Sequence, residues 1–165
     1  MNISKVANNV QQHHALEHAT IHMLSRLHPY LRMMGRSTVS GFMIYGPLST
    51  QEVASAASEA LARLQQGEDY LAVHPRCGTN LAVSSIMAGT AAFGAATLGR
   101  PRSRLERLPL ALIAATVASI LAQPLAHKVQ ERITTSPDVD GLYIAQVVRQ
   151  ERGKIVAHKI IIGRD

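Results

Sequence analysis

The sequence predicts an α+β fold that carries an apolar helical hairpin. Three observations predict it: a histidine-rich helical segment at the start, β-rich segments on both sides of an amphipathic helix, and two long uncharged segments after residue 76. We expect a His-rich helix with a β-α-β unit over 1–76, a transmembrane helical hairpin over 77–127, and a C-terminal β-hairpin over 128–165 that joins the sheet.

The composition restricts the class of protein. The chain has 165 residues, of which 47% are hydrophobic and 17% are charged, a balance that excludes a disordered chain. Its single cysteine, Cys77, excludes an intramolecular disulfide. The net charge of +6 is spread along the chain and tryptophan is absent, so we expect no nucleic-acid partner. The polar start of the chain predicts no secretory signal peptide.

The first predicted element is a helix from about Ile3 to Leu27. No glycine or proline interrupts the sequence from Val6 until Pro29, which ends the helix. Apolar residues recur on it at spacings of three to six, at Ala15, Ile21, Leu24 and Leu27.

A β-α-β unit is expected next. Thr38–Tyr45 is rich in β-branched and aromatic residues and predicts a strand. Ser49 followed by Glu52 forms a capping box, so a helix should begin there and end before Gly67. The segment Asp69–His74 predicts a second strand.

Two uncharged segments predict the hairpin. Cys77–Gly99 and Leu108–His127 contain 23 and 20 residues, close to the roughly 20 that cross a bilayer as a helix. The link Arg100–Arg107 is short and carries four arginines, which predicts a basic tip. A buried helix pair in a soluble core is the alternative. One row of small residues would let another helix approach closely, at Ala88, Ala92 and Ala96.

The last segment predicts a β-hairpin. Gly141–Gln150 and Lys154–Ile162 are both rich in β-forming residues, and Glu151 to Gly153 form the turn between them. We expect these strands to extend the sheet of the β-α-β unit.

The residues His14 to His18 have the form H-x-x-E-H, the pattern of metal-binding helices. Residues four apart lie on one helix face, so His14 and His18 can bind one metal ion, and Glu17 can act as general base on a metal-bound water. His22 lies about 12 Å along the helix axis from His14. We therefore expect His22, together with His13, to orient a ligand or the substrate.

A third ligand is expected from the segment that precedes the hairpin. His74 and Cys77 both have metal-ligand chemistry, and either the thiolate of Cys77 or His74 could complete a zinc site. A carboxylate is the alternative third ligand, from Glu52, Glu59 or Glu68.

These two motifs in this order resemble the YqhQ-like family of uncharacterised bacterial membrane proteins. The matching positions are His14, Glu17, His18, Thr20, Ile21, His22, His74, Pro75, Cys77, Gly78 and Thr79. The resemblance implies a membrane protein that is a predicted metal-dependent enzyme.

The expected function is that of a membrane-anchored protein that holds a divalent metal ion, zinc or another, and hydrolyses a peptide or other polar bond near the bilayer. The alternative is a non-catalytic, metal-stabilised accessory subunit with a closed site of His14, His18, His74 and Cys77. Its partners would be membrane lipid and either a second copy or a larger membrane complex, bound through the small-residue row. A ligand-binding or haem-binding membrane protein is a third option.

The arginine-rich link favours a cytoplasmic position for the hairpin tip, which would place the soluble parts outside. However, the first 76 residues show no signal for crossing the membrane, and a thiolate ligand suits a reducing compartment. We therefore expect a bacterial inner-membrane protein whose soluble part faces the cytoplasm.

Overall fold

The computed structural model describes residues 3–97, 104–153 and 155–165. The chain divides into two compact units. The first contains residues 1–74 and 131–165, and the second contains residues 75–130. The basic tip that the sequence predicts over Arg100–Arg107 lies largely outside the described residues, because 98–103 are not among them.

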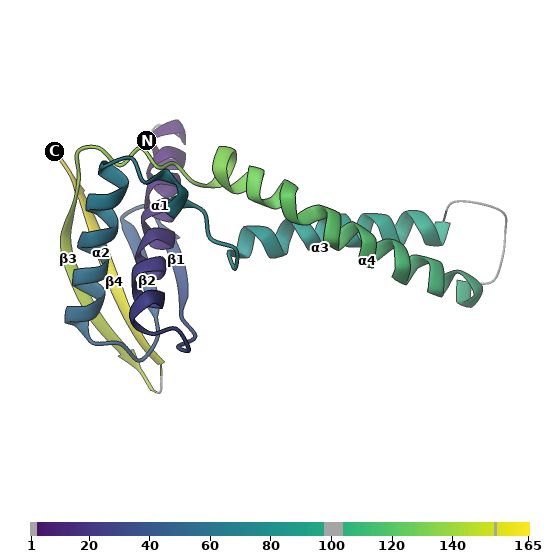
Figure 1. Ribbon diagram of the computed structural model, residues 1–165, viewed down its shortest axis with the longest axis horizontal. Helices are drawn as coiled ribbons and strands as arrows, with labels where there is room; N and C mark the ends of the chain where they lie inside the picture. Colours follow the sequence, from purple (N-terminus) through teal and green to yellow (C-terminus); the bar gives the residue numbers. More distant parts are fainter. Residues whose placement is uncertain (1–2, 98–103, 154) are drawn as a thin grey trace. The chain divides into compact units, whose positions relative to one another are not determined.

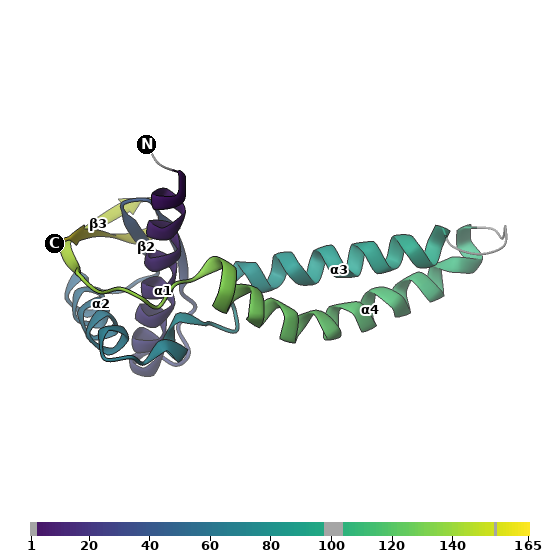
Figure 2. The same ribbon diagram turned by 90° about the horizontal axis from the view of Figure 1, so that it is seen from above.

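The first unit is a two-layer α+β structure (Figures 1 and 2). Its antiparallel sheet contains β1 (Met34–Thr38), β2 (Gly41–Tyr45), β3 (Leu142–Arg152) and β4 (Ile155–Arg164) in the order β1-β2-β4-β3. Helix α1 (Ile3–Leu27) packs on β1 and β2, while α2 (Thr50–Gln65) packs on β3 and β4. The two helices also contact each other, so they cover the same face of the sheet.

The core lies between the sheet and the two helices. Cross-strand partners point to the same face, and Phe42 lies opposite Ile160 in the register of β2 and β4. Both side chains are fully buried, as are Ile44 of β2 and Leu16 and Leu24 of α1. The alternation of β2 therefore aims its large apolar residues at the helices.

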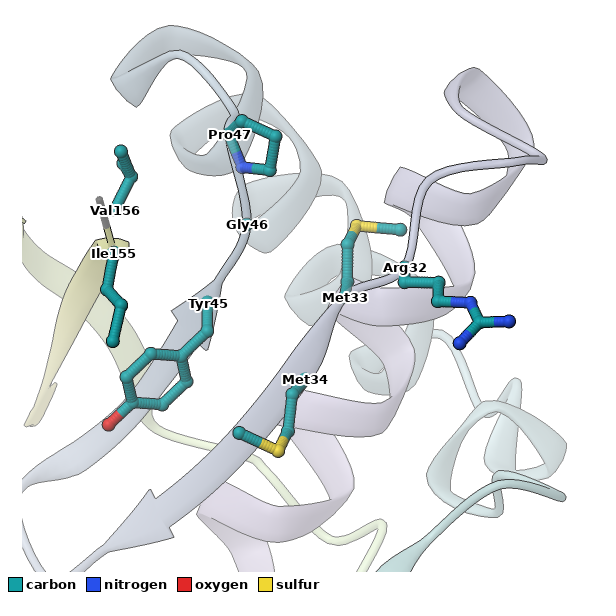
Figure 3. A pocket seen from close by; sticks show the side chains of 8 residues that line it. All are labelled: Arg32, Met33, Met34, Tyr45, Gly46, Pro47, Ile155 and Val156. Atoms are coloured by element: carbon teal, nitrogen blue, oxygen red, sulfur yellow. The ribbon is translucent and has the colours of Figure 1, made fainter.

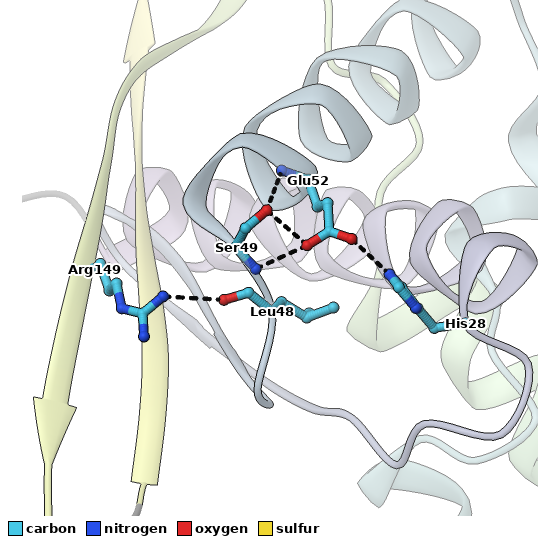
Figure 4. Close-up of polar contacts among 5 residues, drawn as sticks. All are labelled: His28, Leu48, Ser49, Glu52 and Arg149. Atoms are coloured by element: carbon cyan, nitrogen blue, oxygen red, sulfur yellow. Dashed lines mark hydrogen bonds and ion pairs between the residues drawn. The ribbon is translucent and has the colours of Figure 1, made fainter.

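The predicted helix boundaries are confirmed. Helix α1 spans Ile3–Leu27, ahead of Pro29. At the start of α2 the Ser49 side chain accepts from the backbone N–H of Glu52, and the Glu52 carboxylate accepts from the backbone N–H of Ser49 at 2.8 Å (Figure 4). After α2, Gly67 adopts φ +87°, a conformation that favours glycine.

The predicted β-α-β unit is wrong in its second strand and incomplete in its first, which contains β2 but only the last residue of β1. The single strand over Thr38–Tyr45 is a β1–β2 hairpin whose turn lies between Thr38 and Gly41. The segment Asp69–His74 is not a strand, since Asp69–Ala72 form a 3-10 helix, η1. Leu71 and Ala72 are both buried, and a strand cannot bury two consecutive side chains on one face. The place beside β2 is taken by β4 instead.

The predicted C-terminal hairpin is confirmed, and it joins the sheet. Strands β3 and β4 pair from Leu142–Arg164 to Arg152–Ile155, close to the expected boundaries. Gly153 in the turn adopts φ +63°. Strand β4 then pairs with β2, which brings segments from before and after the helical pair into one sheet.

The second unit is a pair of helices that pack along each other, α3 (Gly78–Thr97) and α4 (Arg104–Val129). A π-helical segment, η2 (Gln130–Thr134), continues α4. Many large apolar side chains of α4 are exposed, among them Leu112, Ile113, Ile120 and Leu121.

Within the described residues, one segment is long and apolar enough to cross a membrane, Glu106–Thr134. The prediction of two such helices is therefore corrected to one. Helix α3 is long enough, but its described residues do not reach the mean hydropathy of a membrane span. In the small-residue row of α3, Ala88 and Ala92 are half-buried and Ala96 is exposed.

Candidate metal centre

A row of imidazoles follows one face of α1. His14 and His18 are four residues apart, and their ring centroids are separated by 4.3 Å. One ring nitrogen of His14 lies within 4.8 Å of one ring nitrogen of His18. His18 is buried and His14 is half-buried. The α-helix therefore places the two imidazole rings close enough for one ion to contact both.

Backbone carbonyls fix the orientation of both rings. Nδ1 of His18 lies 2.7 Å from the carbonyl oxygen of Ala72, and Nδ1 of His14 lies 2.8 Å from that of Thr134. Because a carbonyl oxygen only accepts, each Nδ1 carries the hydrogen, and in the neutral ring the lone pair is on Nε2. Metal-binding histidines are commonly oriented by this kind of Nδ1–H···O=C bond.

Both acceptor carbonyls lie at the ends of short helices. Ala72 is the last residue of η1, and Thr134 is the last residue of η2. The final carbonyls of a helix have no partner within it, so they need donors from elsewhere. The imidazole N–H groups of α1 supply such donors. Burial of Leu71 and Ala72 in the core holds η1 in place beside α1.

The segment after η1 adds His74 to this row. The ring centroid of His74 lies 5.8 Å from that of His18 and 4.9 Å from that of His22. Nε2 of His22 lies 2.9 Å from the carbonyl oxygen of Val73, so this nitrogen carries the hydrogen in the neutral ring. The first unit thus brings together a row of four imidazoles, which we call the histidine row: His14, His18, His22 and His74.

Glu17 and His13 leave α1 toward β1, on a different side from the histidine row. The hydroxyl of Ser37 donates a hydrogen bond to the Glu17 carboxylate, which is 6% exposed and lies against Gly35. Nδ1 of His13 lies 2.8 Å from the carbonyl oxygen of Thr38. Burial lowers the pKa of His13 below its ordinary value, although the bond to Thr38 opposes this effect.

Cys77 belongs to the second unit and immediately precedes α3. The backbone N–H of Thr79 donates to its Sγ at 3.4 Å. The side chain is half-buried and forms no disulfide.

The three carboxylates that the sequence offered as alternative ligands have other partners, and Glu52 accepts from Nε2 of His28 at 2.8 Å. Glu52 accepts from the backbone of Ser49. Arg63 forms ion pairs with Glu59 at 2.8 Å and with Glu68 at 3.5 Å.

A separate cavity of about 360 Å³ lies near the start of β1 (Figure 3). No histidine, cysteine or acidic residue is among its described lining residues, which are Arg32, Met33, Met34, Tyr45, Gly46, Pro47, Ile155 and Val156. The residues of the histidine row therefore do not line this cavity.

The sequence could not show the groups that orient the imidazoles. The acceptors at Ala72, Val73 and Thr134 are backbone carbonyls, which every residue carries. Ser37 and Gly35, which hold Glu17, are also missed, because nothing in the sequence pairs β1 with this helix turn.

Comparison with known proteins gives a family but no activity. Residues 9–147 match the family described as "Domain of unknown function (DUF6391)". The chain is 38% identical over 136 residues to an uncharacterized protein of Picosynechococcus sp. (strain ATCC 27264 / PCC 7002 / PR-6), an alignment that covers 77% of this chain. The chain spans 66% of the length of that relative. No solved structure matches the chain.

Proposed function

Since the chain belongs to the DUF6391 family, whose function is unknown, we propose from the site itself that it is a membrane-anchored protein that binds a divalent metal ion, zinc by its ligand chemistry. The family is uncharacterised and the uncharacterized relative is cyanobacterial, in agreement with the expectation of an uncharacterised bacterial family. Kinship with the YqhQ-like family is part of this proposal, and its support is the pair of motifs around His14 and His74.

The orientation of His14 and His18 carries the proposal. Their rings stand 4.3 Å apart, and each is held by a hydrogen bond from Nδ1 to a backbone carbonyl. Two neutral rings whose lone pairs are on Nε2 are ready to bind a cation without rearranging their tautomers. Imidazole nitrogen is a preferred ligand of zinc.

A further ligand is proposed from His74 or Cys77. His74 stands 5.8 Å from His18, ring centroid to ring centroid. Cys77 follows His74 by three residues, and a chain of three residues spans at most about 11 Å. A thiolate tethered this closely has both the reach and the chemistry to complete a zinc site.

Two forms of the proposal differ in the role of Glu17. In the hydrolase form, Glu17 removes a proton from a metal-bound water. The form without catalysis, a metal-stabilised accessory protein, is favoured by the contacts of the carboxylate with Ser37 and Gly35, which hold it at β1. We therefore prefer the accessory form.

The membrane anchor is proposed to be the hairpin of the second unit. The segment Glu106–Thr134 is long and apolar enough to cross a bilayer, and lipid would cover its exposed side chains. A cytoplasmic position of the first unit in a bacterial inner membrane is part of the proposal. Contact with a second copy or a larger complex through the exposed part of the small-residue row, at Ala96, is also part of it.

Elemental analysis of the purified full chain tests the proposal. The variants His14→Asn and His18→Asn keep an N–H donor near the Nδ1 position but remove the metal ligand. We expect each to lose one equivalent of zinc, whereas His127→Asn, at an exposed histidine of α4, keeps the full content. Equal zinc content in the unmodified chain and all three variants would refute the proposal.

Two measurements separate the forms of the site. Cobalt(II) substitution should give a thiolate charge-transfer band that disappears in Cys77→Ser if Cys77 is a ligand. If the metal is structural, a chelator should unfold the first unit, and Glu17→Gln should keep both metal and fold. A chelated protein that stays folded would instead favour the hydrolase form.

A further inference from the structure

The histidine row is too long for one metal ion. A zinc–nitrogen bond of about 2.1 Å puts the ion about 3.2 Å from a ring centroid, so two rings that share an ion have centroids about 5 Å apart. His14 and His22 start two helical turns apart, about 12 Å along the axis of α1. One ion therefore cannot bind both ends of the row.

The ring spacings divide the row into two closer pairs. The centroids of His14 and His18 are 4.3 Å apart, and those of His22 and His74 are 4.9 Å apart. The distance between the pairs, from His18 to His74, is longer at 5.8 Å. Each pair is thus closer within itself than to its neighbour.

The second pair is also prepared to bind a cation. Because Nε2 of His22 donates to the carbonyl of Val73, the lone pair of its neutral ring is on Nδ1. His22 and His74 are both half-buried, so an ion can reach them from water. His74 is fixed next to α1 by the burial of the preceding Leu71 and Ala72.

We infer that His22 and His74 form a second divalent-metal site beside the His14–His18 site. The inference rests on the proposed function in that it extends the same histidine row. It assigns His74 to the second site and leaves Cys77 as the additional ligand proposed for the first. Neutral imidazole pairs select zinc, copper(II), nickel or cobalt(II), whereas magnesium and calcium require oxygen ligands.

Zinc titration of the metal-free full chain in detergent tests this inference. We expect two zinc equivalents to bind to the unmodified chain and none of magnesium to bind to the row. His22→Gln keeps an N–H donor for the Val73 carbonyl but removes the imidazole, and we expect it to bind one equivalent. His74→Gln should also bind one, and the control His127→Gln should bind two. Circular dichroism of each metal-free variant checks that the fold is retained.

The outcomes distinguish the two proposals. If the unmodified chain binds one equivalent and His22→Gln retains it, the second site is refuted while the first stands. If His14→Asn and His18→Asn bind as much zinc as the unmodified chain while His22→Gln loses an equivalent, the proposed function fails and the second site stands. If each of the four single-residue variants in the histidine row loses all the zinc, the row holds one shared ion and the second site is refuted. The zinc stoichiometry of the unmodified chain can be measured even if a variant fails to fold.

Discussion

Gly35 of β1 lies directly against the carboxylate of Glu17 on α1. A Cβ at Gly35 would overlap the nearer carboxylate oxygen and would come within 2.5 Å of Cδ. The same carboxylate accepts a hydrogen bond from Ser37, two residues along the strand. Glycine is needed at position 35 because the strand and a buried, hydrogen-bonded side chain approach each other closely, and its φ angle is not in the left-handed region.

Replacing Gly35 by alanine should destabilise the protein by about 1–3 kcal/mol, the usual cost of adding atoms to a well-packed interior. The added methyl group would displace Glu17 and break its bond to Ser37. Thermal unfolding of the full chain in detergent, followed by circular dichroism, measures the effect. Gly89→Ala is the matched control, because a Cβ there meets nothing within 4 Å. Equal melting temperatures for the two variants would contradict this account of Gly35.

Ser49→Ala should destabilise α2 by about 1 kcal/mol, because it removes the N-cap. Hydrogen bonds from Ser49 and then His28 lower the pKa of Glu52 to about 2 (Figure 4). The stabilisation from the Glu52 carboxylate is therefore present above its ordinary pKa of 4.5 and is lost as the pH falls through about 2.

Carboxylate NMR titration of Glu52 measures this directly. We expect its pKa to rise toward 4.5 in Ser49→Ala. Ser58→Ala, at an exposed position in the same helix, should leave both the pKa of Glu52 and the stability unchanged. A Glu52 pKa that stays near 2 in Ser49→Ala would show that the Ser49 hydroxyl is not its main cause.

Local signals explain which elements could be predicted. Pro29 ends α1 and the Ser49–Glu52 pair begins α2, and both depend on residues a few positions apart. Segment 69–74 looked like a strand because it is rich in β-forming residues. The place beside β2 is occupied by β4, which lies more than 100 residues after β2 in the chain, so segment 69–74 does not join the sheet there. No local pattern carries that information.

In the candidate site, too, the features set by local spacing could be predicted, and those set by long-range contacts could not. Helical spacing was enough to bring His14 and His18 together, because the geometry of one helix determines it. The bond from His14 to the carbonyl of Thr134 joins residues 120 positions apart, and it depends on how the chain returns after α4. The contact of Glu17 with β1, away from the histidine row, could not be predicted either, because it is a tertiary contact between a helix and a strand.

His158 should make stability depend on pH. Its side chain is fully buried on β4, opposite Ile44, and its Nδ1 has no hydrogen-bond partner among the described residues. It faces Thr50 of α2, and burial, with a smaller contribution from Arg149, lowers its pKa below 6.5. The folded chain therefore binds its proton at lower pH than the unfolded chain does, and stability should fall as the pH drops below about 6.5.

His158→Leu removes this titrating group at similar volume. The loss of melting temperature between about pH 7.5 and about pH 5.5 should become smaller than in the unmodified chain. His127→Leu removes an exposed histidine of α4 and should leave the loss unchanged. A loss that is the same in His158→Leu as in the unmodified chain would mean that protonation of His158 does not oppose folding.

Ile120→Arg should weaken membrane insertion of α4. Ile120 lies at the middle of the Glu106–Thr134 segment and is 62% exposed, so lipid would surround it. An arginine at the centre of a spanning helix costs about 2.5–3.5 kcal/mol, whereas one near the end can extend its charge to the interface. Ile133→Arg is the matched control, because Ile133 is 61% exposed but lies near the end of the segment. Alkaline extraction of membranes should release more of the Ile120→Arg protein than of the control, and equal release of both would indicate that α4 does not cross the bilayer.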